Sequence, residues 1–180
     1  MDHRINWKIV AWGAALLILL LPLVAMQFTT EVNWDVADFV ILGAMLAVAF
    51  GVSDFVTRTV HGRAYRAAVS LMLATAFILI WLNLAVGLIG AEDNPLNLMY
   101  GGVLSTSAIG VVVVRLRPTG MARTMFATAL AQFLVAAIAV ISVQPGDGNL
   151  MVEIIALNGF FSTAWLMSAW LFLSAAWAQA

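Results

Sequence analysis

The sequence predicts an all-α polytopic membrane protein, in which residues 1–180 form one domain and six transmembrane helices pack as a bundle. Three observations lead to this fold class. Apolar stretches of ~20 residues recur along the chain, and a helix of that length crosses the hydrocarbon core of a bilayer. The connections between them are short, which favours antiparallel neighbours and leaves no room for a soluble domain. Basic connections also alternate with acidic ones.

The charged residues indicate the orientation of the helices. The basic residues fall in three segments of the chain: Arg4 and Lys8; Arg58, Arg63 and Arg66; and Arg115, Arg117 and Arg123. Basic residues resist translocation and so mark the cytoplasmic side. Most of the acids lie in or beside the other three connections. We therefore expect both termini in the cytoplasm, an N-in, C-in arrangement.

The first two spans are expected over about residues 9–27 and 35–57. The first apolar run is long for a cleaved signal peptide, so we expect it to be a retained span. It contains Pro22, and proline can kink a helix. Asn33 or Asp35 is the expected N-cap of the second span, since both residue types accept hydrogen bonds from free backbone N–H groups.

The other four spans are expected over about residues 66–90, 95–114, 121–143 and 150–177. Asn94 followed by Pro95 is typical of an N-cap with proline in the first helical position. Residues 117–120 (Arg-Pro-Thr-Gly) are expected to break the fourth span from the fifth. Asn149, which follows a turn over residues 145–148, is the expected cap of the sixth.

Composition excludes several classes of function. The chain is 64% hydrophobic and 9% charged, whereas a soluble domain is about 25% charged. It has no cysteine, which excludes disulfides and cysteine catalysis. No basic patch is dense enough for nucleic-acid binding. Neither His3, His61 nor the single lysine lies within a span, so haem and a buried retinal are not expected. We predict no cofactor and no metal site, although a bound lipid is compatible with the composition.

Acidic residues gather on the predicted outer side. An outer acidic collar is expected from four of them: Glu31, Asp35, Glu92 and Asp93. Such a ring would attract cations. The structural alternative is that acids at the N-terminal ends of three outward-facing spans are favoured by the helix dipole. Asp38 and Glu153 lie about a turn further in, where a charge usually has a partner or a function.

Polar residues within the spans are the second group of candidates. Five of these residues are candidates for lining a solute or ion path: Asp38, Asn83, Gln132, Glu153 and Asn158. The amides among them must find partners, because hydrocarbon offers none. The alternative is that they form hydrogen bonds between helices and hold the bundle together.

Small residues recur at a spacing of four on two spans. They are Gly43, Ala47 and Gly51 on the second span, and Gly102, Thr106 and Gly110 on the fourth. Such faces let helix backbones approach closely. The spacing indicates tight packing, either within one chain or between copies.

Three segments carry a resemblance: residues 31–35 (EVNWD), 83–94 (NLAVGLIGAEDN) and 117–123 (RPTGMAR). Together they resemble a group of small, uncharacterised bacterial inner-membrane proteins of about this length. The resemblance implies a multi-pass protein of the bacterial inner (cytoplasmic) membrane, and it carries over no activity and no site residue.

Two functional hypotheses follow. The first is a non-catalytic subunit or self-associating membrane protein, whose partners are the lipid bilayer and either further copies or another membrane protein. The second is a small channel, or a proton- or cation-linked transporter, with an acidic outer mouth. No set of nucleophile, base and acid is apparent, so an enzyme is not expected.

Overall fold

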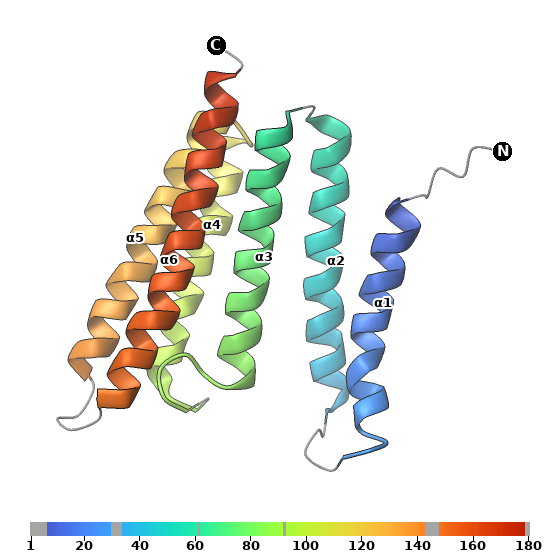
Figure 1. Cartoon of the computed structure of the whole chain (residues 1–180), viewed down its shortest axis with the longest axis vertical. Coiled ribbons are helices and arrows are strands. Elements are labelled where there is room, and N and C mark those ends of the chain that lie inside the picture. The colour runs from blue at the N-terminus through green and yellow to red at the C-terminus, as the bar shows by residue number, and fades with distance from the viewer. Residues whose placement is uncertain (1–6, 30–33, 61, 92, 143–147, 179–180) are drawn as a thin grey trace. The chain divides into compact units, whose positions relative to one another are not determined.

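The computed structural model describes residues 7–29, 34–60, 62–91, 93–142 and 148–178. Every regular element in these ranges is a helix, which confirms the all-α class. Contacts divide the chain into two compact units, Met1–Thr59 and Val60–Ala180 (Figure 1). Each unit is described by itself, and the single bundle expected from the short connections stays a prediction.

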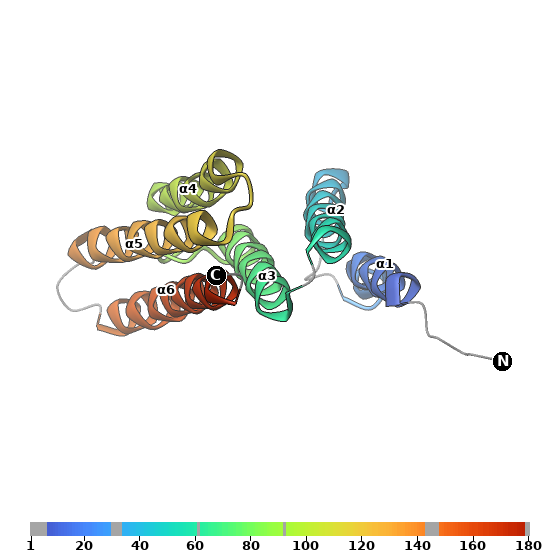
Figure 2. The same cartoon turned by 90° about the horizontal axis from the view of Figure 1, so that it is seen from above.

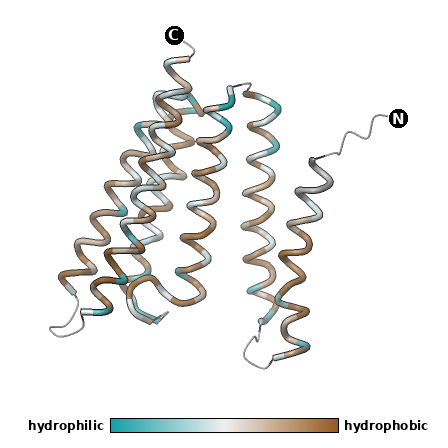
Figure 3. Tube along the Cα trace, viewed as in Figure 1, coloured by the Kyte–Doolittle hydropathy of each residue, from teal (hydrophilic) through white to brown (hydrophobic). Residues whose placement is uncertain are grey.

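The described helices are those of a multi-pass membrane protein. Five of them are long and apolar enough to cross a bilayer: Val36–Thr59, Arg63–Ala85, Pro95–Val114, Pro118–Ser142 and Gly148–Trp177. A shorter apolar stretch, Trp12–Ala25, accompanies them. Figure 3 shows hydrophobic residues along the helices and hydrophilic ones mostly near their ends. These helices indicate an integral membrane protein, whereas the N-in, C-in orientation stays a prediction.

Unit 1 contains helices α1 (Trp7–Ala25) and α2 (Val36–Thr59). The two helices pack through apolar side chains, and the rings of Trp12 and Phe50 lie 6.0 Å apart. Pro22 lies inside α1, as expected. Near the C-terminal end of α2, Arg58 donates to the carboxylate of Asp54 one turn earlier. Residues four apart lie on one face of a helix, which is the spacing of a helical ion pair.

Unit 2 contains α3 (Arg63–Ala85), the 3₁₀ turn η1 (Pro95–Leu98), α4 (Met99–Val114), α5 (Pro118–Ser142) and α6 (Gly148–Trp177). Helix α5 lies between α4 and α6, and α3 packs against α6 (Figures 1 and 2). Large aromatic side chains fill the centre of the unit: Tyr65, Tyr100, Phe161, Trp165 and Phe172. The Ser168 hydroxyl of α6 donates to the Ala68 carbonyl of α3 over 3.0 Å, which fixes the register of these two helices.

Helix boundaries differ from expectation in several places. Helix α5, for example, begins at Pro118, so residues 118–120 of the expected break are helical. Helix α3 ends at Ala85 rather than near residue 90, because Gly87 and Gly90 adopt left-handed φ angles of 71° and 73°. Asn94 does accept a hydrogen bond from the Leu96 N–H, which confirms the cap, but the turn it opens is 3₁₀. Helix α6 begins at Gly148, so Asn149 lies in its first turn and the expected cap there is wrong.

The basic segments of unit 2 share one end of that unit. The Tyr65 hydroxyl near the start of α3 donates to the Leu116 carbonyl in the α4–α5 turn over 2.7 Å. Arg115 and Leu116 have positive φ angles of 51° and 59°, a conformation that costs energy in residues other than glycine. Arg63 and Arg117 therefore lie at the same end of unit 2, as the alternating charge pattern requires.

Candidate functional site

A buried polar centre joins three helices of unit 2. It consists of Tyr100 on α4, Gln132 on α5 and Asn158 on α6, which are 0%, 0% and 2% exposed. The Asn158 Oδ1 atom accepts hydrogen bonds from the Gln132 Nε2 at 2.8 Å and from the Tyr100 hydroxyl at 3.1 Å. The Asn158 Nδ2 donates to the Ile154 carbonyl at 2.9 Å. One amide thus links α4 to α5 through α6.

One polar atom of the centre has no hydrogen-bond partner among the described residues. The Gln132 Oε1 is buried and has no hydrogen-bond partner within the described ranges, and the same holds for the Trp165 Nε1 on α6. An unsatisfied buried acceptor is costly, and it is the kind of group that a buried water or a small donor would satisfy. The remaining groups of the centre bind one another, and this arrangement suits a structural role between packed helices.

A second asparagine organises the connection between α3 and α4. The Asn97 Oδ1 accepts from the Leu88 and Ile89 N–H groups at 3.0 and 2.9 Å, and its Nδ2 donates to the Ala91 carbonyl at 2.8 Å. Asn97 is 5% exposed. Its side chain therefore supplies the hydrogen bonds that the loop backbone lacks after α3 ends.

Asn83 belongs to this connection and not to the polar centre. Its Nδ2 donates to the Asn97 carbonyl over 3.4 Å, while its buried Oδ1 has no partner among the described atoms. Of the five residues expected along a path, the structure therefore joins Gln132 directly to Asn158 and uses Asn83 elsewhere.

The two inner acids of the expected path, Asp38 and Glu153, belong to different units. Asp38 belongs to unit 1, where it and Asp35 cap α2 reciprocally. The Asp38 Oδ2 accepts from the Asp35 N–H at 2.9 Å, and the Asp35 Oδ1 accepts from the Asp38 N–H at 3.0 Å. This is a capping box with aspartates in both positions. Glu153 is exposed on α6 and so lies on another face of that helix than the buried Asn158.

The outer acidic collar is described only in part. Asp35 caps α2, Asp93 is exposed beside the α3–α4 connection, and Glu31 and Glu92 lie outside the described residues. For Asp35 the structure favours the capping explanation over a cation-attracting ring. Among the described residues, no group of three or more histidines and acids is placed to hold a metal ion.

The small-residue faces divide into packed and open positions. A Cβ added to Gly110 would collide with the Thr124 side chain of α5, and one added to Gly43 would lie 3.9 Å from Leu19 of α1. In contrast, a Cβ on Gly51 or Gly102 would meet no described atom within 4 Å. The remaining members differ as well, since Ala47 is exposed and the Thr106 hydroxyl donates to the Gly102 carbonyl of its own helix.

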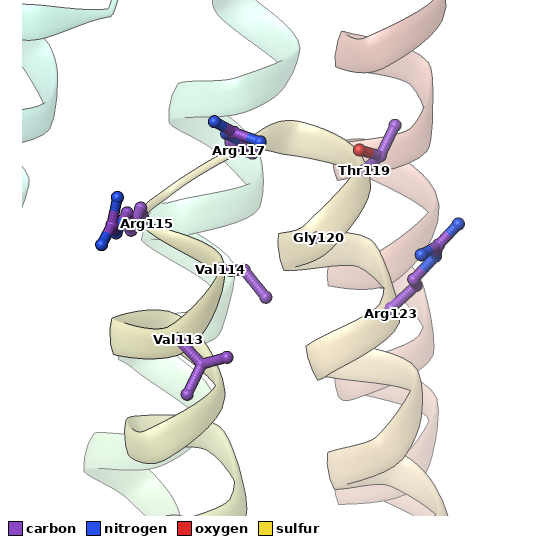
Figure 4. A pocket seen from close by; sticks show the side chains of 7 residues that line it. All are labelled: Val113, Val114, Arg115, Arg117, Thr119, Gly120 and Arg123. Carbon is purple, nitrogen blue, oxygen red and sulfur yellow. The ribbon is translucent and has the colours of Figure 1, made fainter.

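Three hollows lie on the described surface of unit 2. One lies between α5 and α6 and has Asn158 in its wall, beside Gly159 and Ser162. The other two adjoin each other along α4 and α5: a largely apolar groove and a basic hollow at the α4–α5 turn, which Figure 4 shows.

No protein-family model, curated protein or solved structure matches the chain. The resemblance to small bacterial inner-membrane proteins therefore stays a prediction.

Sequence reasoning missed two central residues, Tyr100 and Asn97. Both follow Asn94 and Pro95 closely, and no sequence pattern indicated a role for either. A phenol two turns from an apolar helix end is usually an interface anchor, and nothing in the sequence pairs it with Asn158, 58 residues away. The spacing of Asn97 from Asn94 could have indicated a second, loop-binding asparagine.

Proposed function

We propose that this chain is a non-catalytic membrane protein that acts by associating within the bilayer, with further copies of itself or with another membrane protein. The observation that carries the proposal is the open glycine face of α4. Gly110 is closed by Thr124 of α5, yet Gly102, two turns earlier on the same stripe, has no described atom within 4 Å of an added Cβ. An open glycine within a bilayer allows close approach of another helix.

The use of the polar residues supports the same conclusion. Tyr100, Gln132 and Asn158 bind one another between packed helices, and Asp38 caps a helix. A hydrated path would instead need these groups to face a common cavity. Their pairing favours a protein whose spans serve as a scaffold. Following the sequence resemblance, we place this scaffold in the bacterial inner membrane.

Association can be measured directly in a bilayer. Two differently labelled copies of the full chain are reconstituted into liposomes, and energy transfer between them is followed at increasing dilution in lipid. We expect transfer for the intact chain and its loss for Gly102→Leu, because leucine holds the two backbones apart. Val112→Leu is the matched control, since Val112 is also exposed on α4 but on another face.

Two results would contradict association through Gly102. If the intact chain is monomeric at every dilution, and native mass spectrometry of protein drawn from its own membrane finds neither copies nor a co-purifying protein, the proposal fails. If Val112→Leu abolishes transfer as fully as Gly102→Leu, association does not depend on the open glycine.

A small channel or cation-linked transporter is the second candidate. The observation that favours it is the Oε1 of Gln132, which is fully buried beside Asn158 and has no partner in the part of the chain that the structure describes. In proteoliposomes, a transporter would show proton or cation flux that falls in Gln132→Leu. Absence of flux in the intact chain would remove this candidate and leave association in place.

A further inference from the structure

Three arginines surround a hollow at the α4–α5 turn. Arg115 and Arg117 come from the turn itself and Arg123 from the second turn of α5, and all three line a cavity of about 380 Å³ with Thr119 and Gly120. Figure 4 shows Arg117 at the turn, with Arg115 on the α4 side and Arg123 on the α5 side and their guanidinium groups spread apart. None of the three makes an ion pair with another residue in the ranges that the structure describes. The three arginines therefore present positive charge around the turn that no described acid neutralises.

The turn is built so that it keeps these arginines in place. Arg115 and Leu116 both adopt left-handed backbone angles, and the buried Tyr65 hydroxyl holds the Leu116 carbonyl. Gly120 lets α4 and α5 meet closely, since a Cβ there would lie 2.6 Å from the Val114 side chain. The first N–H groups of α5 have no partners within their helix and add positive potential on the same side.

An apolar groove continues from the basic hollow along the two helices. Its volume is about 550 Å³, and its lining runs from Ser105 to Val114 on α4 and from Arg123 to Ala127 on α5. Val113, Val114 and Arg123 line both the groove and the hollow. At 1.5 Å per residue, Ser105 to Val114 spans about 14 Å. That length is close to half of the ~30 Å hydrocarbon core, the depth of one lipid leaflet.

We propose that this surface binds one anionic phospholipid, with the phosphate and headgroup among Arg115, Arg117 and Arg123 and an acyl chain in the α4–α5 groove. Charge complementarity carries the proposal, because guanidinium groups bind phosphate strongly and often through two hydrogen bonds. The arginines lie at one end of the groove, as the phosphate lies at one end of the acyl chains in a phospholipid. A free phosphate would use the same arginines but would leave the groove without a role.

The proposed lipid site and the proposed association involve different residues of α4. The groove lining begins at Ser105 and Thr106, and Gly102 lies outside it, one turn before Thr106 and further from the arginines. Variants at Gly102 and at Ala127 therefore test the two proposals separately.

The test is a titration of the full chain, purified in detergent and stripped of lipid. Dioleoyl phosphatidylglycerol is added, bound lipid is counted by native mass spectrometry, and dioleoyl phosphatidylcholine serves as the uncharged-headgroup comparison. We expect preference for phosphatidylglycerol and about fivefold weaker binding of it in Arg123→Gln, since a basic residue near the headgroup contributes roughly that factor. Arg58→Gln, which removes the same charge from unit 1, should bind as the intact chain does.

A second pair of variants tests the groove and distinguishes a lipid from a free anion. Ala127→Trp fills the α4–α5 groove and should weaken phosphatidylglycerol binding, whereas Ala137→Trp fills the α5–α6 hollow and should not. Ala127 is exposed and Ala137 is half-buried at the wall of its hollow, and neither belongs to the buried core. Inorganic phosphate at millimolar concentration should not displace the lipid.

Several outcomes would overturn the proposal. One is equal loss of binding in Arg123→Gln and Arg58→Gln, which would indicate general surface charge. Another is full binding in Ala127→Trp together with displacement by inorganic phosphate, which would indicate an anion site without a lipid. Equal binding of the two lipids would exclude recognition of the charge.

Discussion

Asn158 is the residue on which the interior of unit 2 depends most. Its carboxamide accepts from Gln132 and Tyr100 and donates to the Ile154 carbonyl. Replacing it with leucine leaves the two buried donors of Gln132 and Tyr100 without their acceptor. We predict that Asn158→Leu lowers the free energy of unfolding by about 1–2 kcal/mol, within the range measured for lost hydrogen bonds in proteins and membrane proteins.

Thermal unfolding in detergent, followed by circular dichroism, measures this loss. Ile155→Leu is the matched control, because Ile155 lies on the exposed side of the same helix. A double-mutant cycle with Gln132→Leu should show coupling between the two sites. Equal midpoints for Asn158→Leu and Ile155→Leu would mean that the polar centre contributes no stability.

Gly87 and Gly90 offer a matched pair in the α3–α4 connection. Both have left-handed φ angles, so alanine is strained at either position, by about 1 kcal/mol. At Gly87, however, the added Cβ would also lie 2.6 Å from the Ala91 carbonyl oxygen and 2.7 Å from the Asn97 Nδ2, whereas at Gly90 the nearest atom is 3.7 Å away. We predict that Gly87→Ala destabilises the chain clearly more than Gly90→Ala does.

The comparison uses the same thermal unfolding assay, with protease sensitivity of the connection as a local measure. Gly87→Ala should speed cleavage between α3 and α4, since it displaces the Asn97 side chain that holds the loop. If the two variants behave alike, strain from φ alone explains both, and the close approach of Asn97 to Gly87 contributes nothing to the loss of stability.

At the scale of elements, α4 shows how one stripe of small residues can have two environments. Gly110 faces Thr124, whose Oγ1 and Cβ would lie 2.8 and 3.0 Å from an added Cβ, while Gly102 faces open space. We predict opposite signs: Gly110→Ala destabilises unit 2 by about 1 kcal/mol through overpacking, and Gly102→Ala stabilises it by up to about 1 kcal/mol through helix propensity.

A second substitution, at Thr124, should compensate for the destabilisation caused by Gly110→Ala. Thr124→Ala removes the two nearest atoms, Cγ2 and Oγ1, so Gly110→Ala should cost less in that background than in the intact chain. Unfolding midpoints of the four proteins give the coupling. An additive result would show that α4 and α5 relax around the new methyl group without using Thr124.

The positions of the helices were largely predictable, because apolar length and proline or asparagine at helix starts act locally. The end of α3 was not. Residues 86–90 are apolar enough to continue a span, and only the backbone reveals that Gly87 and Gly90 turn the chain there. Likewise, period-four spacing indicated that α4 packs closely, but it could not distinguish Gly110, which faces α5, from Gly102, which does not.

At the scale of the whole molecule, the sequence pattern identified the polar residues but not their connections. The pairing of Gln132 with Asn158 depends on the antiparallel register of α5 and α6. The pairing of Tyr100 with Asn158 depends on the position of α4 beside α5. Registers of this kind follow from side-chain packing over whole helices. For Asp38 the sequence offered a local signal: the spacing of Asp35 and Asp38 is that of a capping box, which accounts for an acid one turn inside a helix.

The orientation of the chain can be tested with cysteines, since the native sequence contains none. The cysteines leave every basic residue unchanged, because basic residues set the topology and acids contribute little to it. Gly62→Cys and Thr119→Cys report on the basic end of unit 2, Asp93→Cys on its opposite end and Val36→Cys on the acidic end of α2. All four positions are exposed.

A membrane-impermeant maleimide is applied to intact cells and to inverted membrane vesicles. Six spans with both termini inside predict that Gly62→Cys and Thr119→Cys react only in inverted vesicles, and that Val36→Cys and Asp93→Cys react only in intact cells. The shared end of Arg63 and Arg117 in the structure requires at least that the first two agree. If Val36→Cys instead reacts from the same side as Gly62→Cys, α2 does not cross the membrane. Unit 1 would then lie on one face of the bilayer, and the alternating charge pattern would hold only for unit 2.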